Sequence, residues 1–216
     1  MKITLLCSLL ALALLNACGP APEAKKDSAI TNQVATASNT NELAIIKTSE
    51  GEMVLEFWSD VAPKTVENFK KLAHSKFYDA TCFHRVIPEF MIQGGDPLTK
   101  DPLKKNLYGK GGPDWHVKAE FSDRKHERGV ISMARSKDPD SAGSQFFICL
   151  GEANSSRLQA LNGKYTAFGK LIKGDDVLEK IGKTPCTGPN SMGEMSVPVN
   201  RIEVFTVQIV PRDSVK

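Results

Sequence analysis

Short segments in which apolar and polar residues alternate recur from about residue 42 to residue 211. Met53, Leu55 and Phe57 form one such series, and Phe205, Val207 and Ile209 form another near the C-terminus. A period of two is typical of strands with one buried face. We predict strands at 43–47, 52–57, 82–87, 90–93, 129–134, 145–150, 167–171 and 202–210.

Two segments have helical spacing instead. Pro63 can occupy the first turn of a helix, in which Val66, Phe69 and Ala73 share one face. A second, shorter helix is predicted at about 175–181, with acidic residues at its start and a glycine after its end. Eight strands and two helices predict a mainly β fold, an eight-stranded antiparallel closed barrel capped by two α-helices.

The N-terminus has a different pattern. Lys2 precedes an apolar run over residues 3–15, which is shorter than the roughly 20 residues that a membrane-spanning helix needs. The run ends in Leu15-Asn16-Ala17-Cys18, which resembles the signal of bacterial lipoproteins. Residues 1–17 are therefore interpreted as a lipoprotein signal peptide and Cys18 as the lipidated residue. The alternative is an ordinary secretory signal that happens to end at a cysteine.

Residues 18–41 would then connect a lipid to the domain. They are rich in Ala, Ser, Thr, Asn and Pro and have no aromatic residue, which is typical of a flexible tether. Two or more lipid chains give stable anchoring. Gly19, rather than an aspartate, follows Cys18, so the usual inner-membrane retention signal is absent. We expect a protein of the cell envelope, anchored to the membrane at the periplasmic face of the outer membrane.

Composition narrows the class of protein. With 28 basic and 25 acidic residues and 41% hydrophobic residues, the chain is typical of a soluble folded domain and gives no reason to expect a nucleic-acid partner. We predict one domain over residues 42–211, a tail at 212–216 and a monomer. The histidines lack metal-ligand spacing, and no phosphate-binding loop or nucleophile elbow is present, so neither a metal nor a cofactor is expected.

Three segments carry candidate chemistry. Residues 83–96 combine an arginine, an aromatic ring and an amide at Arg85, Phe90 and Gln93 and end in two glycines. Residues 143–148 join a glycine turn to an aromatic strand, and residues 161–170 begin with an Asn-Gly turn. All three resemble the cyclophilins, the peptidyl-prolyl cis-trans isomerases, as do residues 62–69 and 129–135.

The resemblance implies an isomerase of X-Pro bonds in unfolded or partly folded polypeptides. It assigns catalysis to Arg85, Phe90, Gln93 and Phe147, with Arg85 as the donor to the proline nitrogen. The substrate-binding residues that it implies are His84, Met91, Ala134, Arg135, Leu161 and Tyr165. Phe146, next to Phe147, is expected in the barrel core, because neighbours on a strand face opposite ways. The alternative function is a module on the same fold that binds proline peptides or acts as a chaperone, with incidental turnover.

Overall fold

The computed structural model describes residues 41–189 and 193–215. The predicted signal peptide, Cys18 and the tether up to residue 40 lie outside the described residues. In the described part, no helix is both long and apolar enough to cross a membrane. The strands are β1 (Glu42–Thr48), β2 (Gly51–Phe57), β3 (Thr81–Phe83), β4 (Arg85–Ile87), β5 (Met91–Gly94), β6 (Val130–Met133), β7 (Phe146–Cys149), β8 (Ala167–Lys173), β9 (Cys186–Thr187), β10 (Val197–Pro198) and β11 (Ile202–Pro211).

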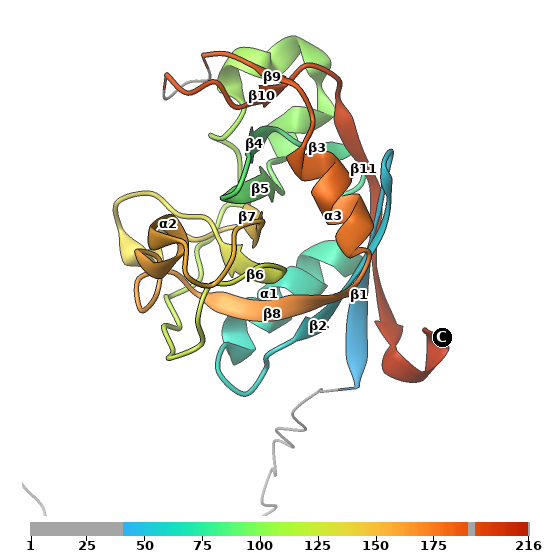
Figure 1. Cartoon of the computed structure of the whole chain (residues 1–216). Helices are drawn as coiled ribbons and strands as arrows, with labels where there is room; N and C mark the ends of the chain where they lie inside the picture. Colours follow the sequence, from blue (N-terminus) through green and yellow to red (C-terminus); the bar gives the residue numbers. More distant parts are fainter. Residues whose placement is uncertain (1–40, 190–192, 216) are drawn as a thin grey trace, which may run out of the picture. The chain divides into compact units, whose positions relative to one another are not determined.

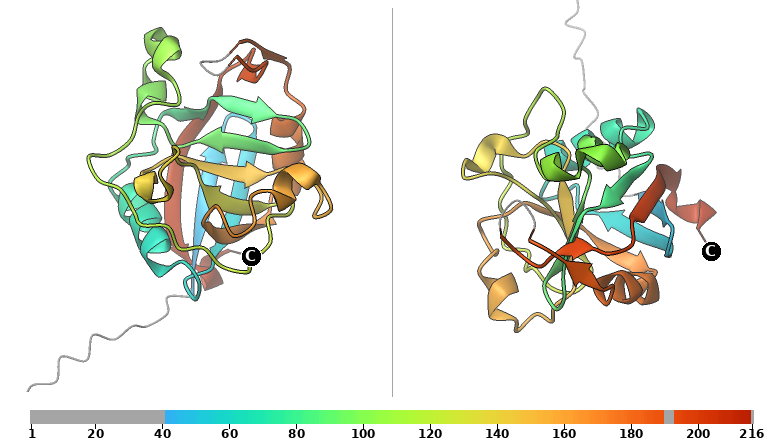
Figure 2. Two further views of the ribbon diagram at one scale, coloured as in Figure 1. Left: turned by 90° about the vertical axis from the view of Figure 1, so that its left-hand side faces the viewer. Right: turned by 90° about the horizontal axis from the view of Figure 1, so that it is seen from above.

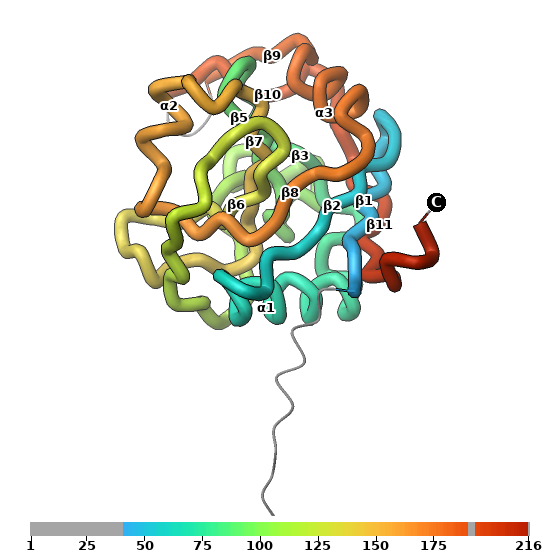
Figure 3. The backbone as a smooth tube through the Cα atoms, turned by 60° about the horizontal axis from the view of Figure 1, so that its bottom comes forward, coloured from blue at the N-terminus to red at the C-terminus, as the bar shows by residue number. Residues whose placement is uncertain are grey.

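One antiparallel sheet wraps around nearly to closure (Figures 1 and 2). Its nine strands follow the order β3-β11-β1-β2-β8-β6-β7-β5-β4, so the two ends of the sheet are consecutive in the chain. Only His84 separates β3 from β4. β3 pairs with β11 and β4 with β5, and β1, β2 and β8 lie side by side (Figure 3). The predicted barrel is confirmed, and the count is nine because the strand predicted at 82–87 is divided at His84.

The helices are α1 (Pro63–His74), α2 (Ser156–Gln159) and α3 (Asp175–Gly182). Pro63 occupies the first turn of α1, as predicted. Both α1 and α3 contribute apolar side chains to the barrel core, Phe69 from the first and Leu178 from the second. The sequence analysis did not predict α2, because its four residues are too few to show a helical period. The remaining helical turns are 3-10 helices at Pro97–Lys100, Pro102–Leu107, Pro139–Ser141 and Arg212–Ser214.

Apolar side chains form two separate clusters. The larger one fills the barrel and contains an aromatic group in which Phe69 contacts Tyr78, Phe146 and Phe168. The smaller cluster holds Phe147 among side chains from β5, α2 and β8. Phe146 and Phe147 are neighbours on β7 and therefore point to opposite faces of the sheet. The prediction that Phe146 belongs to the core is confirmed.

The predicted alternation in the last strand is wrong at one residue. Val207 is buried and Ile209 packs against the core, but Phe205 is 55% exposed. The pairing of β1 with β11 shifts at this point, since Lys47 lies opposite Thr206 whereas Thr48 lies opposite Val204. The extra residue of this β-bulge is Phe205, which turns its ring outward and changes which face the later residues occupy.

A small hairpin follows α3. β9 pairs with β10, and the backbone N–H of Val86 donates to the carbonyl of Ser196 at 2.8 Å. The hairpin therefore covers the outer edge of β4. Cys186, which belongs to β9, is partly buried, whereas Cys82 and Cys149 are buried; all three are free thiols. Burial raises the pKa of each of these thiols.

Candidate active site

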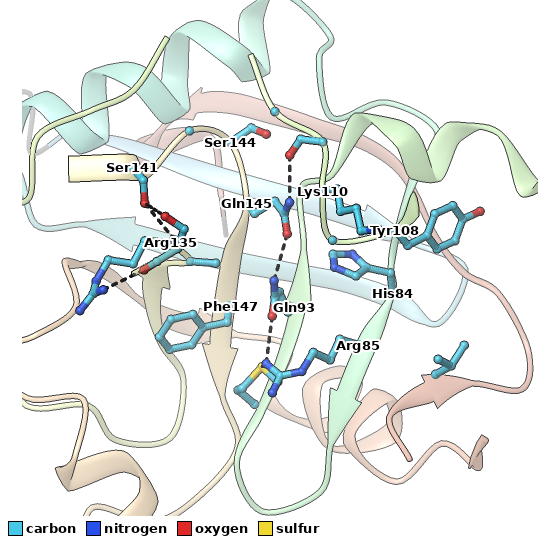
Figure 4. A pocket seen from close by; sticks show the side chains of 18 of the residues that line it. His84, Arg85, Gln93, Tyr108, Lys110, Arg135, Ser141, Ser144, Gln145 and Phe147 are labelled. Atoms are coloured by element: carbon cyan, nitrogen blue, oxygen red, sulfur yellow. Dashed lines mark hydrogen bonds between the residues drawn. The ribbon is translucent and has the colours of Figure 1, made fainter. Parts of the chain in front are cut away.

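A groove of about 1240 Å³ runs across the outer face of β4, β5 and β7 (Figure 4). It is larger than the roughly 300–1,000 Å³ of most small-molecule pockets, and it is open, so it can hold an extended peptide. The structure brings all of the predicted groove residues together in its lining: His84, Arg85, Phe90, Met91, Gln93, Ala134, Arg135, Phe147, Leu161 and Tyr165.

A hydrogen-bond relay crosses the floor of the groove. Arg85 Nη1 donates to Gln93 Oε1 at 3.1 Å, and Gln93 Nε2 donates to Gln145 Oε1 at 3.0 Å. Gln145 Nε2 then donates to the carbonyl of Gly111 at 2.9 Å (Figure 4). Because a guanidinium group can only donate, it dictates the orientation of both amides along the relay. Arg85 is thus held in place by Gln93 of β5, by the residue just before β7 and by the loop after β5.

That loop is organised by the buried carboxylate of Asp96. The carboxylate accepts from the backbone N–H of Leu98 at 2.7 Å and from that of Gly109 at 2.5 Å. Gly111 passes so close that a Cβ atom there would lie 2.1 Å from Asp96 Oδ1. Only glycine permits this approach, which places the Gly111 carbonyl where Gln145 reaches it.

A second edge of the Arg85 guanidinium group, formed by Nε and Nη2, contacts an acidic residue of the hairpin. Arg85 Nε lies 2.7 Å from Glu194 Oε2, and Arg85 Nη2 lies 2.9 Å from Glu194 Oε1. This is the bidentate geometry that gives an arginine–carboxylate pair its directionality. The side chain of Arg85 is 16% exposed and that of Glu194 is 35% exposed, so the pair is only partly shielded from solvent screening.

The apolar part of the groove is built around Phe147. The ring of His126 stacks on it with centroids 6.0 Å apart, and Tyr165 meets it edge-on at 5.9 Å. His126 is in turn held by Ser132 Oγ at 3.0 Å and Asn162 Oδ1 at 3.1 Å. Burial lowers the pKa of His126. The pocket therefore has apolar walls that are packed against one another.

Two arginines cover the rims of this apolar pocket. The guanidinium of Arg157, on α2, lies 4.4 Å from the centre of the Phe90 ring. The guanidinium of Arg135 lies 4.5 Å from the Tyr165 ring and donates to the Lys164 carbonyl at 2.9 Å. The backbone N–H of the neighbouring Ala134 donates to the Gln145 carbonyl at 2.9 Å. Cation–π contacts of this kind restrict the motion of both partners at the rim.

His84 occupies the break between β3 and β4. It is 8% exposed, and within the described chain neither ring nitrogen has a hydrogen-bond partner. Burial, opposed in part by the charge of Asp96, lowers its pKa to about 4. The imidazole is therefore neutral near pH 7, and it packs edge-on against Tyr108 in the groove lining.

Sequence reasoning missed several groove residues. Gln145 stands two positions before Phe147, so the period of a strand could have placed both on one face. Glu194 is 109 residues away from Arg85, and no local pattern marks it. Tyr108 and Lys110 also line the groove, from a segment without a regular strand or helix. In the part of the chain that the structure describes, no group of three or more His, Cys, Asp or Glu side chains could hold a metal ion.

Comparisons with known proteins agree with this geometry. The family model described as cyclophilin type peptidyl-prolyl cis-trans isomerase/CLD matches residues 43–208. A probable peptidyl-prolyl cis-trans isomerase of Brucella abortus is 40% identical over 157 residues, which are 70% of this chain and 76% of that protein. A peptidyl-prolyl cis-trans isomerase of Acinetobacter baylyi is 38% identical over 170 residues, which are 78% of this chain and 86% of that protein.

A solved structure is also similar. The crystal structure of a cyclophilin type peptidyl-prolyl cis-trans isomerase of Cryptosporidium parvum, determined in the presence of the dipeptide Ala-Pro, superposes with a TM-score of 0.66 at 33% sequence identity. The match covers 78% of this chain and 98% of that one. It therefore includes nearly the whole of that protein.

Proposed function

The chain belongs to the cyclophilin-type peptidyl-prolyl cis-trans isomerases and accelerates rotation about X-Pro bonds, and we propose that Arg85 is the residue that lowers the rotational barrier. That barrier is about 18–20 kcal/mol, because rotation breaks the amide resonance. Resonance requires the nitrogen lone pair to be delocalised into the carbonyl. A donor directed at the nitrogen stabilises the twisted state, in which the lone pair is localised there, more than the planar ground state.

The rest of the groove holds the substrate while the bond turns. The proline ring enters the apolar pocket of Phe90, Met91, Phe147 and Leu161. The residue before proline lies along Ala134 and Arg135. Since one side of the bond is enclosed and the other lies in the open groove, rotation needs no covalent step. Gln93 contributes by keeping the guanidinium of Arg85 at the wall of this pocket.

The observation that carries this assignment is the position of Arg85. Its Nη1 atom lies 3.1 Å from Gln93 Oε1 and 3.9 Å from the sulfur of Met91, so the cationic end of the side chain borders the apolar pocket. The test is an isomerisation assay of a short X-Pro peptide with the parent chain and with Arg85→Ala. Loss of an electrostatic donor to a transition state reduces kcat by about a hundredfold or more, and we expect that effect here.

A matched control is Arg128→Ala. Arg128 also makes a bidentate ion pair, with Asp175 at 2.8 and 3.1 Å, but it does not line the groove. This variant should keep the parent kcat/KM. A fully active Arg85→Ala protein with an unchanged circular dichroism spectrum would contradict the role of Arg85. The alternative function, a module that binds proline peptides, would be favoured by a different pair of results. The parent chain would fail to accelerate rotation of the X-Pro bond, and Arg85→Ala would still bind proline peptides.

We further propose that the enzyme works in the cell envelope, attached by a lipid on Cys18. The support is the sequence pattern alone: an apolar run over residues 3–15, the segment Leu15-Asn16-Ala17-Cys18, and a tether without aromatic residues before β1. Its clients would be proline-containing polypeptides that fold on the periplasmic side of the outer membrane. The enzyme would act on them as a monomer, since the groove is built from one chain.

Labelling with a clickable palmitate analogue tests the anchor. The parent chain, expressed in a bacterium with two membranes, should take up the label and fractionate with the outer membrane. Cys18→Ser should take up none, whereas Cys186→Ser should be labelled like the parent. A labelled Cys18→Ser protein would show that the lipid is attached elsewhere. Light scattering in detergent measures whether the protein is a monomer.

A further inference from the structure

We propose that Glu194 is a positioning residue for Arg85, supplied by the hairpin of β9 and β10. This inference rests on the proposed role of Arg85 and adds a second holder to the relay through Gln93. The relevant geometry is the pair of contacts at 2.7 and 2.9 Å between the Glu194 carboxylate and the Nε and Nη2 atoms of Arg85 (Figure 4 shows Arg85 in the groove).

The two contacts occupy one edge of the guanidinium group. Of its five N–H groups, two point at Glu194 and one at Gln93. Nη1 retains a further N–H beside the sulfur of Met91 at 3.9 Å, and Met91 belongs to the apolar pocket. The carboxylate thus lies on the edge away from that pocket. It leaves the Nη1 side, which borders that pocket, without a carboxylate partner, which is the arrangement of a holder rather than of a blocking group.

The hairpin fixes Glu194 in turn. Two residues after Glu194, the Ser196 carbonyl accepts from the N–H of Val86, the neighbour of Arg85 on β4. Gly188 lies so close to the opposite side of the hairpin that a Cβ atom there would be 2.6 Å from the Glu194 carbonyl. The backbone that carries the acid is therefore docked on the strand that carries the arginine. Thr187 and Val197 of the same hairpin line the groove.

An arginine side chain has many rotamers, and holding both edges of its guanidinium removes most of them before substrate arrives. We therefore expect Glu194 to affect the turnover step more than binding. In Glu194→Ala, kcat should fall about tenfold while KM stays within about twofold, because a small misplacement of a reacting group has effects of this size or larger. Glu194→Asp keeps the carboxylate and should recover part of the loss.

Glu194→Gln separates charge from size. Its amide can offer only one oxygen to two N–H donors and places its own NH₂ against the other, so this variant should resemble the alanine variant. The control is Asp175→Ala, which removes the acid from the pair with Arg128, outside the groove, and should leave kcat unchanged. All variants are measured as the full chain in mild detergent.

A spectroscopic readout tests the pair independently of activity. The ¹⁵Nε–¹H signal of Arg85 should exchange slowly with water in the parent chain and rapidly in Glu194→Ala. Unchanged exchange, an unchanged kcat, or a higher kcat in Glu194→Ala would each overturn the proposal. If the parent chain failed to isomerise peptides, the role of Arg85 would fall instead, and the exchange measurement would still decide whether Glu194 holds it.

Discussion

Acid should destabilise this domain through His84. Because burial lowers the pKa of His84 from 6.5 to about 4, the unfolded chain binds a proton at this residue that the folded chain excludes. Stability therefore rises with pH between these two values. The contribution is complete above about pH 6.5 and is lost progressively as the pH falls toward 4.

The size of the effect follows from the two pKa values. Their difference, converted at 1.36 kcal/mol per pH unit, corresponds to about 3 kcal/mol of unfolding free energy. Typical domains have only about 5–15 kcal/mol in total, so this is a large share. Asp96 and the backbone of Cys82 raise the pKa of His84, Arg85 lowers it, and Tyr108 packs against the ring. Burial is the largest of these effects, so the net shift of the pKa is downward.

Urea unfolding, followed by tryptophan fluorescence at several pH values from 4 to 7.5, measures the slope. His84→Gln cannot be charged, so its unfolding free energy should depend on pH much less than that of the parent. His126, whose pKa burial also lowers, adds to the slope in the same direction, and His84→Gln/His126→Gln should be flatter still. His74→Gln, which replaces an exposed histidine in the last turn of α1, is the control for the substitution itself. Equal slopes for His84→Gln and the parent would refute the reasoning.

Five further variants test the architecture of the groove and of the core beneath it. Gln145→Ala breaks the relay and leaves Gln93 Nε2 without its acceptor, so kcat/KM should fall about tenfold. This size is consistent with about 1–3 kcal/mol for an unsatisfied donor. Gln145→Glu keeps an acceptor oxygen and should lose less activity. Phe147→Ala should lower kcat/KM more than tenfold, while Phe146→Leu, in the barrel core, should lower only the unfolding free energy, by about 1 kcal/mol. Gly188→Ala should slow turnover as Glu194→Ala does, because its Cβ displaces the hairpin. Peptide assays and urea titrations check all five variants.

The strands of the large sheet, the two longer helices and part of the groove lining could be predicted from the sequence. Alternation with period two depends only on which residues are apolar and where they stand, and a sheet with one buried face requires that pattern. The same alternation explains why Phe146 lies in the barrel core and Phe147 lines the groove. The groove residues were found through motifs, since Arg85, Phe90 and Gln93 lie within one short segment.

The tertiary structure determined the exposure of Phe205 and the burial of His84, neither of which the local sequence pattern could predict. The bulge that exposes Phe205 arises where β11 meets β1, so it depends on the partner strand rather than on the residues of β11. The burial of His84 depends on where the sheet closes, because β3 and β4 pair with different neighbours on either side of it. A residue's surroundings are set in both cases by chain segments that are distant in sequence.

The contact between Glu194 and Arg85 shows the same limit most clearly. The hairpin that carries Glu194 has strands of two residues each, which are too short to produce a periodic signal. It forms at the edge of β4, where the N–H of Val86 would otherwise lack a partner from the sheet. The sequence by itself, through its resemblance to the cyclophilins, predicted that Arg85 belongs to the substrate groove, and Arg85 does line the groove of the structure. Only docking across 109 residues determined which acid holds it, because the energy of that contact depends on distance in space and not along the chain.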